Sequence, residues 1–399
     1  MTAADVPAAV RELRSAAAVR RRCTALWTAG LAGDLGHLRI HERAWPAVLD
    51  AVAAQVVATR PAGPVPIHGR LNHLRGEGWD LAADLVARAG TAQVDAVVIS
   101  VLLDAGAGSR WRFEDPVTGT VRRSEGLAVA AHRALEAGVF AGDGRAYGVD
   151  AVALADLDVG RLADAFQVTA DNPLVGVEGR AGLLRALGRT LVESGAGSVW
   201  ELLSRDLLGG RGTGQVAQVS GEALLGWILT AFADLWPGRL DIGGFNLGDT
   251  WHHPLAGGTF PTSGVVPFHK LSQWMAYSLV EPLASLGVAV VEVEGLTGLA
   301  EYRNGGLLID LGLLEVRGGL RADPIPPDHP LVVEWRACTV AALDHIAVHL
   351  DRHLPEERRG LGLAQILEVG TWPLGRRLAA ERRPDAAPPI AVESDGTVF

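Results

Sequence analysis

Lysine occurs once in this chain of 399 residues, at Lys270, and arginine takes all the other positions among the 36 basic ones. An amine can lose its proton in a desolvated site and then act as a base or nucleophile, whereas a guanidinium stays charged. The single lysine is therefore either a chance survivor or a residue kept for chemistry that arginine cannot perform.

The residues around Lys270 predict the start of a helix. Pro267 suits a first helical position, and Leu271 and Trp274 begin an apolar face. His269 and Lys270 then lie at the positive end of the helix dipole, where two basic groups are unfavourable unless an anion answers them. The stretch predicts either an anion site, for which phosphate is suited, or a lysine with a lowered pKa.

Two further stretches carry polar residues among glycines. His68 and Arg70 lie in residues 66–78, where they suit an anion or a sugar, although a solvated loop explains them equally well. Asp104 ends an apolar run just before Gly106 and Gly108. Those glycines favour close approach of a ligand, or simple helix termination.

Glu301, Tyr302 and Arg303 stand between two glycine breaks in residues 296–306. A carboxylate on such a turn can be partly buried, which would raise its pKa. The alternative is a surface glutamate paired with Arg303.

Asp249 precedes His252 and His253, which raises the question of a metal site. Adjacent histidines seldom bind one ion from a helix, and no His-Glu-x-x-His pattern is present. We therefore expect neither a metal nor another cofactor. Residues 393–399 end in Val398 and Phe399, which could dock on the protein by their apolar side chains. If this segment docks near the site, Asp395 is a further candidate acid.

Helical periodicity dominates the elements that must position these residues, which predicts a mainly α globular protein. One β-hairpin is expected over 111–123, and a second extended piece over 287–294. Lobes of residues 1–145 and 146–399 meet at a weak boundary, so one compact unit is the alternative. The predicted helices cover residues 7–31, 44–59, 79–90, 92–103, 124–138, 151–165, 178–195, 197–207, 221–235, 269–286 and 331–350.

Composition narrows the function classes. A formal charge of −10 argues against a nucleic-acid partner but allows a small phosphorylated ligand. Cys23 and Cys338 are the only cysteines, which fits a reducing compartment. No apolar run approaches the roughly 20 residues of a membrane span. We expect a cytoplasmic protein without a membrane partner, and the sequence leaves its oligomeric state open.

Several stretches resemble the Urc4/Urg3 family of the uracil-catabolism cluster of yeasts and bacteria. They are SVLLDAGAGSRW, RSEGLAVA, DNPLVGVEGR, VPFHKLSQW, LTGLAEYRNGG, VVEWRACTV and SDGTVF, and they span nearly the whole chain. Gly69 and Leu71 depart from this pattern, because the family more often has serine and tryptophan there. The contacts of that segment are correspondingly less defined.

A more distant likeness connects residues 173–180, 270–273 and 300–303 to the queuosine salvage glycosidases, which resemble helix-hairpin-helix DNA glycosylases. The catalytic aspartate of that group falls on Glu301. The resemblance implies hydrolysis of an N-glycosidic bond in ribosylurea or its 5′-phosphate. It leaves open an amidohydrolase acting on the same intermediate and a metabolite-binding regulator without catalysis.

The glycosidase hypothesis assigns catalytic roles to Glu301, Lys270 and Asp104. Glu301 would activate water, and a protonated Asp104 or a water would supply a proton to the leaving nitrogen. Lys270 would act as a nucleophile or hold a phosphate. The expected substrate-binding residues are His269, Arg303, Tyr302, His68, Arg70, Asp249 and Trp274.

Overall fold

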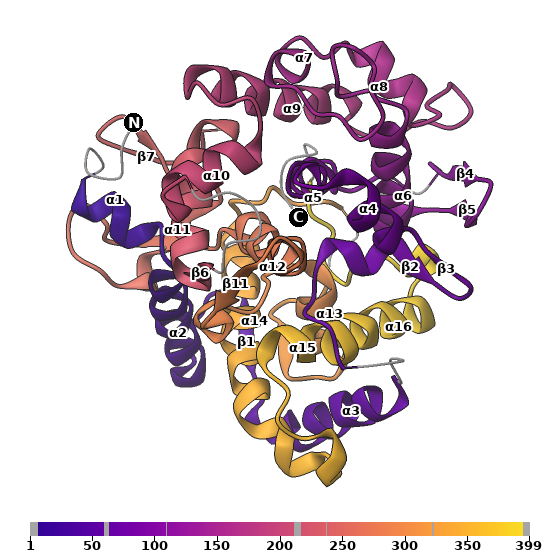
Figure 1. The fold of residues 1–399 in the computed structure, drawn as a ribbon. Coiled ribbons are helices and arrows are strands. Elements are labelled where there is room, and N and C mark those ends of the chain that lie inside the picture. Colours follow the sequence, from indigo (N-terminus) through magenta and orange to yellow (C-terminus); the bar gives the residue numbers. More distant parts are fainter. Residues whose placement is uncertain are drawn as a thin grey trace. The chain divides into compact units, whose positions relative to one another are not determined.

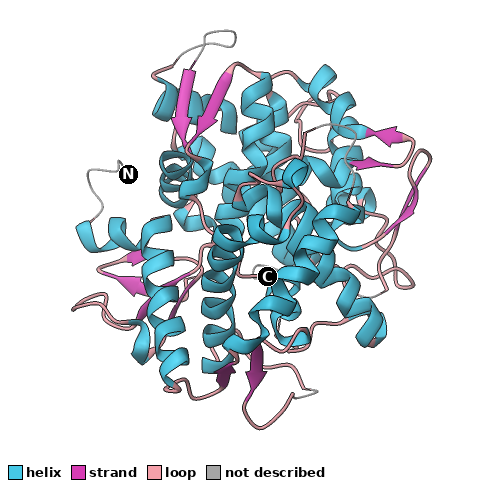
Figure 2. Cartoon of the chain, turned by 90° about the horizontal axis from the view of Figure 1, so that it is seen from below, coloured by secondary structure: helices cyan, strands magenta, loops and turns pink. Residues whose placement is uncertain are grey.

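Helices form most of the chain that the structure describes. This structure is a computed structural model, and it describes residues 7–59, 64–108, 110–210, 217–236, 238–320 and 323–393. Within these ranges, the strands form only short two-stranded pairs among many helices (Figures 1 and 2). The prediction of a mainly α globular protein is confirmed. The C-terminal segment with Asp395 lies outside the described residues.

The chain divides into two compact units, each made of segments distant in sequence. The first contains the described residues up to His68 together with Gly238–Gln273 and Glu294–Glu393. Its helices are α1 (Ala8–Leu13), α2 (Ala16–Ala32), α3 (Trp45–Ala58), α13 (Tyr302–Asp310), α14 (Pro330–His349), α15 (Leu363–Ile366) and α16 (Trp372–Arg382). Its strands are β1 (Leu38–Ile40), β7 (Asp241–Ile242), β8 (Phe245–Asn246), β9 (Thr250–His252), β10 (Val265–Pro267) and β12 (Leu314–Val316).

The second unit contains the described residues of Gly69–Pro237 together with Trp274–Val293. Its helices are α4 (Leu81–Ala89), α5 (Ala92–Leu102), α6 (Arg123–Glu136), α7 (Ala151–Ala155), α8 (Val159–Ala165), α9 (Val177–Glu193), α10 (Val199–Leu208) and α11 (Gly221–Ala231). Its strands are β2 (Arg75–Gly76), β3 (Trp79–Asp80), β4 (Phe113–Asp115), β5 (Gly119–Val121), β6 (Ala217–Ser220) and β11 (Val288–Val291). Helix α12 (Lys270–Ser285) begins in the first unit and continues in the second.

Side-chain caps explain where many helices begin. Ser15, Ser198 and Ser220 each accept the backbone N–H three residues ahead, at the starts of α2, α10 and α11. The cap at Ser15 also divides the single helix predicted over 7–31 into α1 and α2. Local hydrogen bonding by a serine therefore ended one helix and began another where apolar periodicity continued.

The expected extended segments are both present. The hairpin predicted over 111–123 is β4 paired with β5, in which Phe113 lies opposite Val121. The segment predicted over 287–294 contains β11, which pairs in parallel with β6 and places Val288 opposite Ala217. The parallel partner was not predicted, because the two strands are about 70 residues apart in the sequence.

Helix α13 was not predicted, and it packs closely on α16 in the first unit (Figure 1). Gly375 of α16 makes this approach possible: a Cβ there would lie 2.2 Å from the carbonyl oxygen of Arg303. The start of α13, which carries Glu301 as its N-cap, is therefore fixed by backbone-to-backbone packing.

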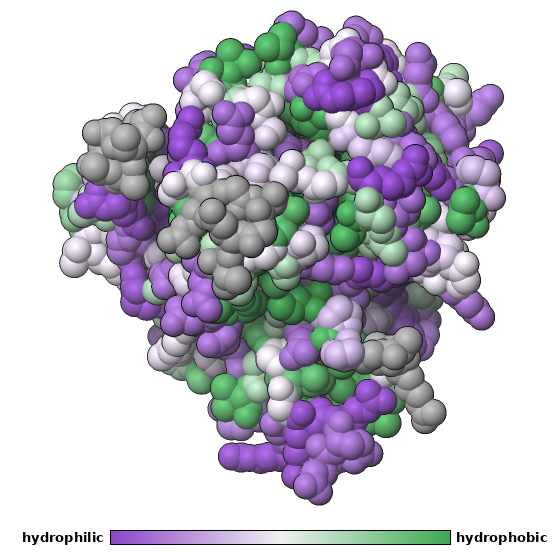
Figure 3. All heavy atoms as spheres, viewed as in Figure 1, coloured by the Kyte–Doolittle hydropathy of each residue, from purple (hydrophilic) through white to green (hydrophobic). Residues whose placement is uncertain are grey.

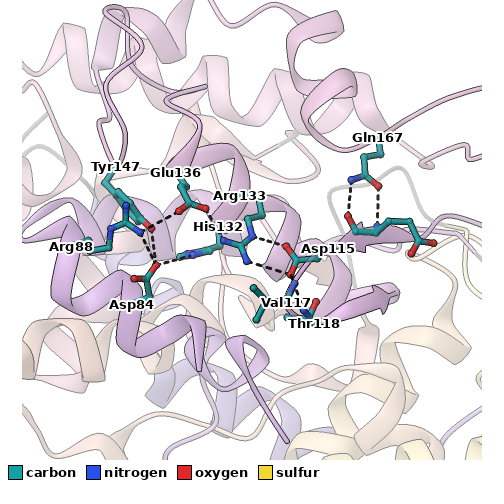
Figure 4. A network of polar contacts seen from close by, with 11 residues as sticks. Asp84, Arg88, Asp115, Val117, Thr118, His132, Arg133, Glu136, Tyr147 and Gln167 are labelled. Atoms are coloured by element: carbon teal, nitrogen blue, oxygen red, sulfur yellow. Dashed lines mark hydrogen bonds and ion pairs between the residues drawn. The ribbon is translucent and has the colours of Figure 1, made fainter. Parts of the chain in front are cut away.

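Charged side chains on the second unit form a connected network (Figure 4). Arg133 contacts the carboxylates of Asp115 and Glu136 at 2.6 and 2.7 Å, and the Tyr147 hydroxyl donates to Asp84 at 2.9 Å. The network fastens the β4–β5 hairpin and α4 to α6. On the face shown in Figure 3, hydrophilic and hydrophobic residues are intermingled, as is usual for a globular protein.

Candidate functional site

Lys270 is the first residue of α12, and Asp249 caps that helix. The Asp249 carboxylate accepts the backbone N–H of Lys270 at 3.0 Å, and its carbonyl oxygen accepts those of Phe268 and His269. His269 has a left-handed backbone, with φ of 49°. The Lys270 side chain is half-buried. Asp249 therefore supplies the negative charge that the positive end of this helix favours.

Arg336 of α14 holds Asp249 in place. Its two terminal nitrogens donate to the two carboxylate oxygens, both at 2.7 Å, and the Trp251 indole donates a further bond at 2.8 Å. Burial alone would raise the pKa of Asp249, but Arg336 holds that pKa well below its usual range. Asp249 is thus an ionised residue whose oxygens are already occupied.

Glu301 is a buried carboxylate at the start of α13. It is 6% exposed and accepts the backbone N–H groups of Arg303 and Asn304 at 2.7 and 2.5 Å. Burial raises the pKa of Glu301, and the charge of Lys270 is the largest of the effects that lower it. The structure therefore brings Lys270 and Glu301 within electrostatic reach of each other. The raised pKa of Glu301 agrees with the expectation from the sequence, and its burial excludes the alternative of a surface glutamate.

His269 lies beside Lys270 in sequence but is enclosed in the core. Its Nε2 donates to the carbonyl oxygen of Leu13 at 3.0 Å, and burial lowers the pKa of its ring. A neutral, buried imidazole is a poor ligand for phosphate. Because Asp249 already occupies the end of α12, the hypothesis of a phosphate held there by His269 and Lys270 loses its support.

Tyr302 and Arg303 follow Glu301 in α13. The Arg303 guanidinium lies 4.8 Å from the centre of the Tyr302 ring and donates to the carbonyl oxygen of Ala386 at 2.8 Å. Arg303 is buried, so it braces the chain after α16 and is not the surface partner of Glu301.

His68 also belongs to the first unit. Its Nδ1 lies 2.6 Å from a carboxylate oxygen of Glu368, and its ring lies 5.7 Å from that of Trp372. These contacts connect His68 to the residues between α15 and the start of α16.

Asp104, Arg70 and Trp274 come together in the second unit. Asp104 accepts hydrogen bonds from Arg70 and from the Ser124 hydroxyl, both at 2.7 Å. The Arg70 guanidinium is fully buried and lies 5.5 Å from the centre of the Trp274 ring. In these contacts Asp104 accepts hydrogen bonds from a guanidinium and a hydroxyl, and none of them shows it donating a proton.

Two buried charged residues of α14 were not predicted from the sequence. Glu334 accepts the backbone N–H groups of Gly36, His37 and Leu38 at 2.9–3.1 Å, and Arg336 binds Asp249 as described. The signal that could have found them is the occurrence of Glu334 and Arg336 inside an otherwise apolar helical run. Charged residues are almost never fully buried unless they are paired.

Neither a metal centre nor a membrane span is found in the part of the chain that the structure describes. There, no three histidine, cysteine, aspartate or glutamate side chains are grouped in a way that would hold an ion. The His253 ring instead lies 3.4 Å from Glu334. Every described helix is too short or too polar to cross a bilayer.

Comparison with known proteins assigns the chain to a family. Residues 12–399 match the family model described as "Protein of unknown function (DUF1688)". Protein urg3 of Schizosaccharomyces pombe is 40% identical over 372 residues, which cover 89% of this chain and 90% of that protein. Uracil catabolism protein 4 of Lachancea kluyveri is 33% identical over 380 residues, covering 84% and 85%. The chain therefore belongs to the DUF1688 family, together with urg3 and uracil catabolism protein 4, as the sequence motifs had predicted.

Proposed function

We propose that this chain acts in uracil catabolism as a hydrolase of an N-glycosidic bond. The name of the Lachancea kluyveri relative, uracil catabolism protein 4, supports the pathway. The reaction that we propose converts ribosylurea, or its 5′-phosphate, and water into urea and ribose, or ribose phosphate. The observation that carries this proposal is the buried Glu301 carboxylate within electrostatic reach of the only lysine.

Glu301 has the properties of a group that moves a proton near neutral pH. Burial raises the pKa of its carboxyl, while Lys270 and two backbone N–H groups limit that rise. Each carboxylate oxygen retains a lone pair after accepting its backbone hydrogen bond. Glu301 would take a proton from water as the water adds to C1′, and return it to the departing urea nitrogen as the C1′–N bond breaks. Its charge would also stabilise the positive charge that develops at C1′.

Lys270 has two possible roles beside such a carboxylate. As a nucleophile, its neutral amine would add to C1′ in place of water, Glu301 would pass the proton of the amine to the departing urea, and water would then hydrolyse the bond between Lys270 and C1′. Alternatively, Lys270 binds a phosphate. The carboxylate of Asp249 at the end of α12 disfavours a second anion in that position. This favours a role for the amine close to Glu301 and C1′. A phosphate, where the substrate carries one, would then be bound by other residues.

Product analysis tests the reaction. The protein is incubated with ribosylurea and, separately, with ribosylurea 5′-phosphate, and the Glu301→Gln variant serves as the control. Urea and free ribose or ribose phosphate, formed by the wild type only, are the expected products. Direct release of ammonia and carbon dioxide would replace the proposal with an amidohydrolase. Thermal stabilisation by the substrate without any product would indicate a metabolite-binding regulator.

A further inference from the structure

We propose that Arg336, acting through Asp249, is a positioning residue that fixes the distance between the Lys270 amine and the Glu301 carboxylate. The catalytic meaning of this assignment rests on the proposed function. The electrostatic coupling of the two groups can nevertheless be measured without any substrate, so the two proposals can fail independently.

One side of the Arg336 guanidinium controls the start of α12. Both terminal nitrogens donate to the Asp249 carboxylate at 2.7 Å, and one oxygen of that carboxylate accepts the backbone N–H of Lys270 at 3.0 Å. Paired donors in a planar fork set the orientation of a carboxylate as well as its distance. The first residue of α12 is therefore held by a group that cannot rotate freely.

The third nitrogen of the same guanidinium reaches the other helix. The Nε of Arg336 donates to the carbonyl oxygen of Ala300 at 3.2 Å, directly before Glu301. Arg336 is 1% exposed, and its guanidinium lies 4.1 Å from the centre of the Phe268 ring. The planar, buried guanidinium of Arg336 thus links the first residue of α12, through Asp249, to the residue before the N-cap of α13.

Lysine at position 336 would keep the charge and lose the geometry. Its ammonium is a point charge on a flexible stem, without a planar fork and without a donor at the position of Nε. The Arg336→Lys substitution therefore separates the position of the guanidinium from its charge. Since the interaction of two charges falls as their separation grows, a looser arrangement weakens the coupling between Lys270 and Glu301.

The single lysine makes this coupling measurable. Reductive methylation with ¹³C-formaldehyde labels Lys270, the N-terminal amine and any lysine that a substitution introduces. Adding Lys270→Arg to each background therefore identifies which NMR signal belongs to Lys270. The pKa of the labelled amine is measured by titration with and without the Glu301→Gln substitution, and the difference is the coupling. We expect the Arg336→Lys background to retain less than half of the coupling measured in the wild-type background.

A matched control exists in the same unit. Arg383 binds both carboxylate oxygens of Asp310, the last residue of α13, at 2.6 Å. Arg383→Lys removes an equally well-formed fork at the opposite end of the helix and should leave the coupling unchanged. Asp249→Glu, which keeps the charge but moves the carboxylate, provides a second variant should Arg336→Lys fail to fold, and it should also reduce the coupling.

The assignment is overturned when Arg336→Lys or Asp249→Glu folds and retains the wild-type coupling, or when Arg383→Lys reduces it as much. With an active enzyme, a positioning role also predicts that Arg336→Lys lowers kcat more than it changes KM. A chain that shows the coupling and its loss, but releases no urea, would leave the positioning role intact and remove the proposed function.

Discussion

Lys270 and an arginine in its place would carry the same charge at neutral pH, but only the amine can give up its proton. If the amine acts at C1′, Lys270→Arg should lower kcat by about 100-fold or more while substrate affinity changes little. Steady-state kinetics and ligand binding to the variant check this. Retention of most of the activity would exclude the nucleophile role and favour a purely ionic one.

Asp104 differs from Glu301 because a buried arginine already neutralises it. Asp104→Asn leaves the Arg70 guanidinium, which is fully buried, without its carboxylate. We expect the free energy of unfolding to fall by about 3–5 kcal/mol, because removal of one partner leaves a buried charge uncompensated. Urea denaturation measures this loss. A variant of wild-type stability and no activity would restore the role of proton donor.

For single residues, the sequence indicated which side chains could do chemistry more readily than it indicated which side chains contact one another. The absence of other lysines pointed to Lys270, and glycines on both sides pointed to Glu301. The Arg336–Asp249 pair was not predicted, because 87 residues separate its members in sequence. Periodicity describes neighbours along one helix, whereas this contact depends on how α14 packs against the residue that directly precedes β9.

Glycines inside helices α13 and α16 explain why the helical structure of this region was hard to predict from the sequence. Gly305 and Gly306 suggested a broken turn over 296–306, but they lie inside α13. A Cβ on Gly305 would lie 2.6 Å from the Trp335 ring nitrogen, so small residues are needed for α14 to approach. Tertiary packing therefore overrode helix propensity.

Gly375 permits the corresponding approach between α16 and α13. Gly375→Ala should destabilise the protein by about 1–3 kcal/mol and reduce activity, because the added Cβ would push the first turn of α13 and its cap Glu301. Gly182→Ala in α9 is the control, since no atom lies within 4 Å of its added Cβ. That substitution should stabilise the protein by up to about 1 kcal/mol. Thermal unfolding of both variants checks the pair; equal effects would contradict the packing argument.

The division of the whole molecule could not be read along the chain. The sequence suggested lobes of residues 1–145 and 146–399, whereas compact packing groups segments from both halves into each unit. Glu334 in α14 binds three backbone N–H groups of residues 36–38, and such contacts leave no local trace in sequence. The local elements could largely be predicted, and the way they assemble could not.

Asp95 should contribute to the pH dependence of the free energy of unfolding. This carboxyl is 1% exposed and accepts the Val199 N–H at 2.6 Å, and burial raises its pKa to about 7. The folded chain thus holds a proton that the unfolded chain has released above pH 3.8, so this contribution to stability falls as pH rises from about 4 to 7. Its limit is roughly 4 kcal/mol.

Asp95→Asn isolates that contribution. The buried histidines His132 and His269, whose pKa values burial lowers, act in the opposite sense near pH 6, so the difference between wild type and variant is the useful quantity. The stability of the variant relative to the wild type should rise with pH from about 4 to 8. Denaturation at several pH values measures it, and a constant difference would contradict the raised pKa.

The solitary lysine has a further consequence for proteolysis. An endoprotease specific for lysine has one peptide bond to cut in this chain, between Lys270 and Leu271, which would leave fragments of 270 and 129 residues. That bond lies in the first turn of α12, where Asp249 caps the helix. Cleavage requires this turn to open, so its rate reports local unfolding at one defined place. A bound ligand that touches Lys270 would appear as protection of a single bond, visible on a gel before the ligand is identified.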